Sequence, residues 1–408
     1  MFTMTPRISS PALLLASIAL LAACEKAEDD TPVSSDPATQ YTERGALAVG
    51  HAVLEQTRKD AEPLQVKAWY PAEASADETI SYAVALKLDG FGGGTVPILG
   101  DAALDASPDT INGPYPLVVL SHGFGMNPEW YHPTAEHLAS HGFVVLGPEH
   151  DEADWFADVI AASTARPRDI SATIDLAAAG ALDGVIDTEH IAVIGHSYGG
   201  YAALAAAGAR FDMDRLAERC ADVTDEFTAS YFCTPFLAGE AELAAAMGLE
   251  AIPEGLWPSL GDSRVDAIVP MAGDAFLFGE QGLAEITVPA MMLGGTGDTG
   301  SPWAWATGLA FDHVSSPSRV QVALEGAEHF IPVTTCDRMP WTAQMPEEFR
   351  GYICEDPAWD KPEALALINQ VTTAFLLHTL TEDAGAEPSL DPSVYQTVDG
   401  FDLTVIGL

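Results

Sequence analysis

Short, fully apolar segments alternate with helix-like segments through the middle of the chain. The apolar segments are "PLVVLS", which ends at Ser121, then Phe143–Leu146 and Ile191–Ile194, and each is typical of a strand buried on both faces. Helical spacing follows the first two, at Pro133–His141 and at Arg166–Ala179. This β, α, β, α, β order predicts an α/β fold with a doubly wound, mostly parallel sheet.

The same pattern resumes in the C-terminal half. Strands are expected at Ala267–Met271, Ala290–Leu293 and Val320–Leu324, and the last helix at Pro362–Leu380. Residues 210–262 interrupt the rhythm with acidic, alanine-rich sequence and no clear strand. We therefore expect a mostly helical insertion there, which is a candidate lid.

The catalytic domain is expected to occupy residues 46–384. Near its start, Val66–Tyr70 and Ile80–Ala85 suit antiparallel strands at the edge of a sheet. The glycine run 90–94 lacks the Lys-Ser/Thr of a phosphate loop and is expected to be a mobile loop. Residues 385–408 form an acidic, proline-containing C-terminal tail with a possible short strand at its end.

The first 45 residues predict export. Residues 1–23 have a sparse positive start at Arg7 and a short apolar stretch, and they end in "LAA" before Cys24. "LAAC" resembles the lipobox of bacterial lipoproteins, which implies cleavage before Cys24 and diacylation of its thiol; the alternative is an ordinary secretory signal with a chance cysteine. Residues 24–45 are rich in Glu, Asp, Pro, Ser and Thr and are expected to be a disordered tether. The expected location is the cell envelope, periplasmic or anchored to the outer membrane, or the extracellular space.

The charge balance excludes several partners. The chain has 17 Lys and Arg against 60 Asp and Glu, a formal net charge of -43. Nucleic acids and anionic lipid surfaces would be repelled, so any membrane contact is expected only through an N-terminal lipid anchor. Such a carboxylate excess also suits a saline habitat, which is a hypothesis.

Besides Cys24, the chain has four cysteines, an even number for an exported protein: Cys220, Cys233, Cys336 and Cys354. Three connectivities are open, and the local pairs Cys220–Cys233 and Cys336–Cys354 are preferred because each closes a short loop. Free buried thiols are the alternative. No pair has metal-ligand spacing, so no metal site is expected.

The stretch "IAVIGHSYGGYAAL", residues 191–204, indicates a nucleophile. Ser197 lies between an apolar strand and a small-residue helix, with Gly195 and Gly199 on either side to free a tight turn. The helix start points amide groups toward developing negative charge. An ordinary glycine turn is the alternative reading of this motif.

An acid and a base follow in the order Ser, acid, His. Asp298 comes after the strand Ala290–Leu293 in "GGTGD", and His329 comes after Val320–Leu324 in "EGAEHF". Both would lie at the carboxyl edge of the sheet, where open α/β sheets gather their sites. A solvated turn aspartate and a surface histidine are the alternatives. Asp274 in "PMAGDAF" also follows a strand and is the runner-up acid.

Two backbone N–H groups are expected to form an oxyanion hole. One is that of Tyr198, directly after the nucleophile, and the other is that of Phe124 in "LSHGFG", where Gly123 lets the backbone turn. The neighbouring histidines are expected to be structural: His122, His150 and His196.

These residues resemble the α/β-hydrolase fold, and more narrowly its platelet-activating-factor acetylhydrolase and dienelactone-hydrolase-like esterases. The resemblance covers Tyr115 to Pro332 and depends on "LSHGFGMNPEWYHPTAEHLASHGFVVLGPEHDE", on "IGHSYGGYAAL" and on the spacing of the later acid and histidine. It implies a triad of Ser197, His329 and Asp298 with neither metal nor cofactor. Dienelactone hydrolases proper use a cysteine nucleophile, from which Ser197 departs.

The expected function is hydrolysis of carboxylic esters through an acyl-enzyme, with a small-molecule or lipid ester as substrate. Short-chain esters and lipid-like esters are both open. A cutinase or polyester hydrolase, a serine peptidase on the same fold and a catalytically silent envelope binding protein are the alternatives. Aromatic residues of the insertion and of loops near strand ends could form an acyl pocket: Trp257, Phe236, Trp130, Tyr131, Trp303 and Trp305.

Overall fold

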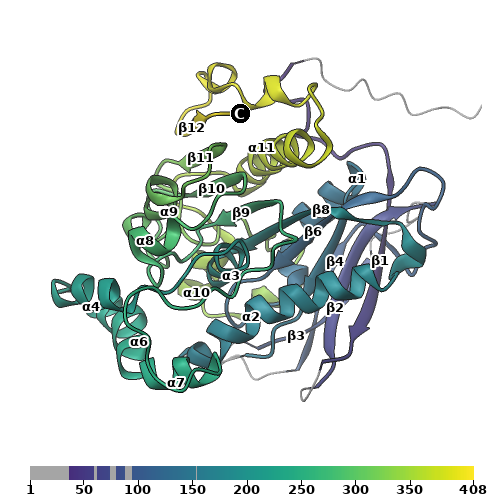
Figure 1. The fold of residues 1–408 in the computed structure, drawn as a ribbon. Coiled ribbons are helices and arrows are strands. Elements are labelled where there is room, and N and C mark those ends of the chain that lie inside the picture. The colour runs from purple at the N-terminus through teal and green to yellow at the C-terminus, as the bar shows by residue number, and fades with distance from the viewer. Residues whose placement is uncertain (1–35, 59–61, 74–79, 88–93, 153) are drawn as a thin grey trace, which may run out of the picture. The chain divides into compact units, whose positions relative to one another are not determined.

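A ten-stranded sheet crosses the structure, with helices on both faces (Figure 1). The computed structural model describes residues 36–408 apart from 59–61, 74–79, 88–93 and 153. The expected signal peptide, the lipidation site at Cys24 and the glycine run up to residue 93 lie outside these described residues.

The sheet is mixed and mostly parallel. In order across it, the strands are β12 (Phe401–Ile406), β11 (Arg319–Leu324), β10 (Ala290–Gly295), β9 (Ala267–Met271), β8 (Ile186–His196), β6 (Tyr115–Ser121), β7 (Val144–Pro148), β2 (Leu64–Ala72), β1 (Ala48–Gln56) and β5 (Ala103–Leu104). The strands from β11 to β7 in this order are parallel, whereas β12, β2 and β1 pair antiparallel. This arrangement is compatible with the predicted α/β class.

The chain leaves β6 toward β7 and then returns to β8 on the other side of β6. A ligand site in an open α/β sheet forms where the strand order reverses in this way, outside the carboxyl ends of the strands. The loop after β6 and the turn after β8 therefore meet at this point.

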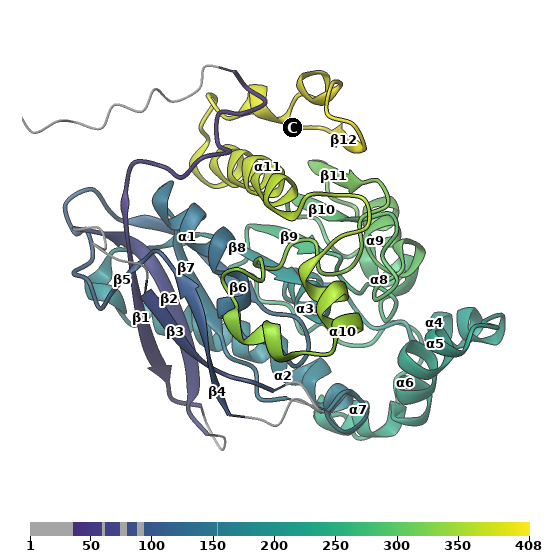
Figure 2. The same cartoon turned by 180° about the vertical axis from the view of Figure 1, so that it is seen from behind.

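Helices cover the two faces of the sheet (Figures 1 and 2). The helices of the main domain are α1 (His132–Ser140), α2 (Trp155–Ala178), α3 (Tyr198–Ala206), α8 (Gly279–Leu283), α9 (Thr307–His313), α10 (Glu347–Cys354) and α11 (Lys361–Thr381). Side chains alternate along β8: Ile191 and Val193 join the core under α2 and α3, and Ala192 and Ile194 join the core under α1 and α11. The sheet is thus buried on both faces, as its apolar strands predict.

Helix α11 is the one helix of the described residues that is long and apolar enough to cross a membrane. Two thirds of its apolar window, 67%, is buried inside the structure, where Ile368 and Val371 belong to the hydrophobic core. Its apolar character is therefore explained by packing against the sheet.

The two N-terminal strands that we expected at the edge of the main sheet do not lie there. Strand β2 lies between β7 and β1, and its residues Val66, Ala68 and Trp69 are buried on the two faces. Strand β3 (Ile80–Ala85) instead pairs with β4 (Thr95–Gly100) in a separate two-stranded sheet. The prediction missed β1 because its sequence, "AVGHAVLEQ", mixes polar and apolar residues.

Residues 36–45 of the expected tether and the expected C-terminal tail contain residues that pack on the domain. Tyr41 is only 7% exposed, and its N–H donates to Gln370 Oε1 of α11 at 2.5 Å, so the chain before residue 45 already packs on the domain. At the other end, β12 pairs with β11, and Leu390 and Tyr395 are buried. The acidic composition hid these scattered apolar contacts, and residues 385–408 complete the domain.

Residues 210–262 carry helices and no strand, all within the described part of the chain: α4 (Met213–Ala221), α5 (Glu226–Thr228), α6 (Thr234–Ala238) and α7 (Glu240–Ala246). Figure 1 shows α6 and α7 beside the N-terminal part of α2. A Cys220–Cys233 disulfide closes a loop within this insertion. A second disulfide, Cys336–Cys354, joins the segment before α10 to the last residue of α10. The two local pairs preferred from the sequence are therefore the ones in the structure.

Candidate active site

Ser197 occupies a strained turn between β8 and α3. Its backbone has φ 56° and ψ -121°, in the left-handed half of the map that a serine seldom adopts. The Ser197 N–H donates to the carbonyl of Met271 at 2.9 Å, and the N–H of Tyr201 donates to the Ser197 carbonyl at 3.0 Å. The two neighbouring elements thus hold the serine in this conformation.

Two glycines make the turn possible. A Cβ atom at Gly195 would overlap the carbonyl oxygen of Gly199, and one at Gly199 would overlap the carbonyl oxygen of Ser121 at the end of β6. Close approach of backbone to backbone therefore requires glycine at both positions, as the motif predicts.

Ser197 and His329 line the same pocket, which has a volume of about 160 Å³. In the described structure, no hydrogen bond joins their side chains. Apolar rings make up much of the wall: Phe124, Trp155, Phe227, Tyr231, Phe232 and Phe330.

His329 is oriented by Asp298. Its Nδ1 lies 2.9 Å from Asp298 Oδ2 and 3.0 Å from Oδ1, and Oδ1 also accepts the N–H groups of Gly300 and Ser301 at 2.8 and 2.7 Å. Burial lowers the pKa of His329, but Asp298, with smaller contributions from Asp274 and Glu328, outweighs this effect, so the pKa is raised above its usual value. Because Nδ1 faces a carboxylate, the proton of the neutral ring is held on Nδ1.

Asp274, the runner-up acid, lies in the same pocket but has a different partner. Its carboxyl accepts a hydrogen bond from Ser301 Oγ at 2.7 Å, and it has no hydrogen bond to His329 among the described residues. The side chain is only 3% exposed, and this burial raises its pKa to about 7, against the lowering effect of Ser301. The structure therefore pairs the histidine with Asp298.

Two backbone N–H groups close to the turn have no hydrogen-bond acceptor in the described structure. They belong to Tyr198, which is the first residue of α3, and to Phe124, which follows β6. The two rings contact each other edge to face at 5.8 Å. The two residues expected to supply oxyanion donors are thus neighbours, and both N–H groups have hydrogen-bonding capacity available.

His122 fixes the peptide before Phe124. Its Nε2 accepts the N–H of His150 at 3.0 Å, so Nδ1 carries the proton and donates to the Gly123 carbonyl at 2.7 Å. Full burial is the main reason why the pKa of His122 lies well below its usual value, and the neighbouring His150 and Arg166 lower it further. The ring is therefore neutral. Since the Gly123 carbonyl points at His122, the N–H of Phe124 points the opposite way.

His196 joins the two loops of the site. Its Nε2 donates to the His329 carbonyl at 2.8 Å, which leaves Nδ1 to accept the Tyr131 hydroxyl at 2.7 Å. The same hydroxyl accepts the N–H of Gly123 at 3.1 Å. The loops after β6 and β11 are therefore linked behind the pocket.

A second Ser-His-Asp chain lies beneath the loop after β6. His150 Nε2 is 2.9 Å from Ser121 Oγ, and His150 Nδ1 is 3.0 Å from Asp169 Oδ2. All three side chains are almost fully buried, and none lines the Ser197 pocket. They support the loop and do not form a site of reaction.

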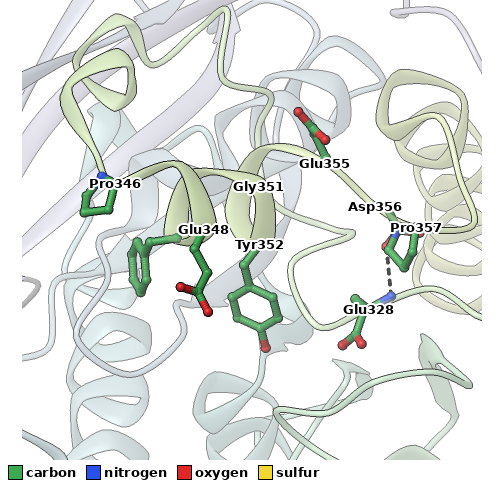
Figure 3. Close-up of a pocket in the computed structure, with 9 residues that line it drawn as sticks. Glu328, Pro346, Glu348, Gly351, Tyr352, Glu355, Asp356 and Pro357 are labelled. Atoms are coloured by element: carbon green, nitrogen blue, oxygen red, sulfur yellow. Dashed lines mark hydrogen bonds between the residues drawn. The ribbon is translucent and has the colours of Figure 1, made fainter.

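A larger cavity, about 710 Å³, is lined by Glu328, the residue before His329, and by residues of α10 and its flanking segments (Figure 3). Glu328, Glu348 and Tyr352 point into it, and the N–H of Glu328 donates to Asp356 at 2.8 Å. Glu328 also accepts hydrogen bonds from the backbone and hydroxyl of Thr299. These bonds fix the loops that carry the acid and the base. In the described residues, no group of three His, Cys, Asp or Glu side chains is arranged to hold a metal ion.

The aromatic wall of the pocket differs from the expectation. Trp257 and Phe236 of the insertion are buried in the hydrophobic core, and neither lines the pocket. Phe232 and Tyr231, close by in sequence, take that place. No sequence pattern shows which of these rings lines the pocket, because that depends on how the insertion folds back on α2.

Residues 101–217 match the family model described as chlorophyllase. The matched segment contains the loop of Phe124 and the turn of Ser197 and ends before Asp298 and His329. No curated protein matches the chain. The similarity indicates a hydrolase of the α/β-hydrolase type that acts on esters.

Proposed function

We propose that this protein is a serine carboxylic-ester hydrolase in which Ser197 is the nucleophile, His329 the base and Asp298 the acid. The observation that carries the proposal is the pocket itself, where a strained serine and a histidine bonded to a carboxylate share one wall. The match to the chlorophyllase family supports ester hydrolysis independently of this geometry.

The reaction would proceed by acyl transfer. His329 Nε2 takes the proton of Ser197 while Oγ attacks the ester carbonyl, and the same proton passes to the departing alcohol. Water then repeats the cycle on the acyl-enzyme and releases the acid. The developing oxyanion accepts hydrogen bonds from the N–H groups of Phe124 and Tyr198, and Asp298 holds the tautomer of the base.

The pocket favours an uncharged ester with a short group next to the carbonyl. A volume of about 160 Å³ lined by aromatic rings suits a small apolar group. The buried carboxyl of Asp274 and the net charge of -43 disfavour anionic groups there. Platelet-activating-factor-like lipid esters, polyesters and peptides are the competing substrates, and a panel of these with acetyl to palmitoyl esters would rank them.

A fluorophosphonate probe tests the serine mechanism directly. We expect covalent modification of Ser197, located by mass spectrometry of the labelled peptide, because such probes react with activated serines. A catalytically silent envelope binding protein would not react, and labelling at another serine would contradict the assignment.

The His122 contact predicts a loss of oxyanion stabilisation. We expect His122→Ala to lower kcat by about 100-fold, the scale of one oxyanion donor, with little change in KM. Affinity for a trifluoromethyl ketone should fall in parallel, which a merely structural defect would not cause. His51→Gln is the matched control, since His51 is equally buried in β1 and lacks hydrogen-bond partners within the described structure. Normal ketone affinity in a folded His122 variant would refute the role.

We further propose that the chain is an exported lipoprotein. The two disulfides are consistent with an oxidising compartment. In a bacterial host, radiolabelled palmitate should be incorporated into the full chain and not into Cys24→Ser. Equal labelling of both chains, or of neither, would argue against lipidation at this cysteine.

A further inference from the structure

Exposed aromatic side chains gather beside the Ser197 pocket. We call Trp155, Phe156, Phe227 and Tyr231 the aromatic ledge. Phe156 is 62% exposed, Phe227 40% and Tyr231 37%, while Trp155 is partly buried. Their rings are in contact, with centroids 4.6 Å apart for Phe227 and Tyr231 and 5.3 Å apart for Phe156 and Tyr231. Adjoining exposed rings of this kind mark a binding surface in a soluble domain.

The ledge is continuous with the pocket. Trp155, Phe227 and Tyr231 also line the pocket that contains Ser197. The indole N–H of Trp155 donates to the Tyr231 carbonyl at 3.2 Å, and its ring packs edge to face on Phe124 at 4.9 Å. A ligand on the ledge would therefore be in contact with the same wall as the reacting ester.

A groove extends from the far side of the ledge. It has a volume of about 520 Å³ and runs between α2 and the helices α6 and α7. Phe156 and Ile160 line it from α2, and Pro235 and Ala238 line it from α6. Phe156 belongs to both the ledge and the groove, so an extended apolar chain could pass from the pocket to the groove over one set of rings.

The charge around this path selects against anions. Residues 151–160 and 224–242, which carry the ledge and most of the groove, include Asp and Glu but neither Lys nor Arg. A fatty-acid carboxylate or a phosphate would meet the like charge of these Asp and Glu side chains. An uncharged hydrocarbon chain fits the path without this penalty.

We propose that the aromatic ledge and the groove bind the long, uncharged apolar chain of an ester whose carbonyl lies at Ser197. The inference rests on the proposed function and adds a substrate class: esters with a short group on one side of the carbonyl and a long hydrocarbon chain on the other. The chain can belong to the alcohol or to the acid, and the test distinguishes the two.

The test is to fill the groove with a bulky side chain introduced at an exposed position. Ala238 is exposed at the end of α6, so Ala238→Trp can obstruct the groove without disturbing the core. Leu237→Trp is the matched control, because Leu237 is 38% exposed on the same helix and does not line the groove. The substrates are p-nitrophenyl acetate, dodecyl acetate and p-nitrophenyl dodecanoate, each kept below its aggregation concentration.

For Ala238→Trp we expect kcat/KM to fall about tenfold for one long-chain ester, since several methylene groups lose their buried contact, while the acetate rate changes less than about twofold. Phe156→Ser should give the same selective loss. A loss on dodecyl acetate alone assigns the chain to the alcohol, and one on the dodecanoate alone assigns it to the acid.

An unchanged ratio of long-chain to acetate activity in both variants would overturn the proposal, and so would an equal loss in Leu237→Trp. Failure of the proposed function has a different signature. In that case Ser197→Ala would keep hydrolysing p-nitrophenyl acetate, whatever the groove variants do.

Discussion

Replacing Ser197 with alanine should lower kcat for p-nitrophenyl acetate by about a millionfold, the scale on which serine triads lose activity when the nucleophile is removed. The Oγ atom is the only part of the turn that would form the acyl bond, and the strained backbone at φ 56° serves to present it to the pocket. Steady-state kinetics with purified protein measure this directly.

Ser140→Ala provides the control for this experiment. Ser140 is buried in α1, where its hydroxyl donates to the His137 carbonyl at 2.6 Å, and it does not line the pocket. Its replacement removes a buried hydroxyl while kcat should stay within about twofold, because the hydrogen bond affects stability alone. Appreciable hydrolysis by folded Ser197→Ala would refute the nucleophile assignment.

The strands and the site residues at their ends could be predicted because both follow from local sequence. The apolar runs at β6, β8, β9, β10 and β11 are strong signals, and parallel strands place whatever follows them at one edge. For that reason Ser197, Asp298 and His329 could be proposed before their distances were known. Asp274 met the same criterion, and only the hydrogen bond from His329 to Asp298 in the structure separates the two acids.

Features that depend on long-range packing could not be predicted in this way. A short strand at the end of the chain could be expected from the sequence, but its pairing with β11 could not, and neither could the hydrogen bond from the Tyr41 N–H to Gln370 Oε1 of α11. The choice of Tyr231 and Phe232 over Trp257 as pocket residues is set by the fold of the insertion. Neither periodicity nor motif spacing carries information of this kind.

Replacing Asp298 with asparagine should lower kcat by about 10⁴-fold, as expected when a triad histidine loses the carboxylate that holds its tautomer. An asparagine can offer an N–H where the ring now donates, which favours the wrong tautomer of His329. The fold should be retained, because the amide oxygen can still accept the N–H groups of Gly300 and Ser301.

Asp298→Asn should also shift the dependence of kcat/KM on pH. In the wild-type protein the pKa of His329 is raised, with burial opposing and Asp298 supporting the charged ring. The neutral ring is the active base, so kcat/KM should rise with pH and reach half its maximum above pH 6.5. Without the Asp298 charge, burial dominates, the pKa falls, and the residual activity should reach its plateau at lower pH.

Asp274→Asn separates the two acids. Burial raises the pKa of Asp274 to about 7, and the charge that this carboxyl gains above that pH favours the protonated form of His329. We expect at most about a tenfold fall in kcat, since among the described residues Asp274 has a hydrogen bond from Ser301 and none from the imidazole, together with a small shift of the acid limb to lower pH. If Asp274→Asn lost more activity than Asp298→Asn, the acid of the triad would be Asp274, and the hydrogen bond from His329 to Asp298 would serve only to position the loop.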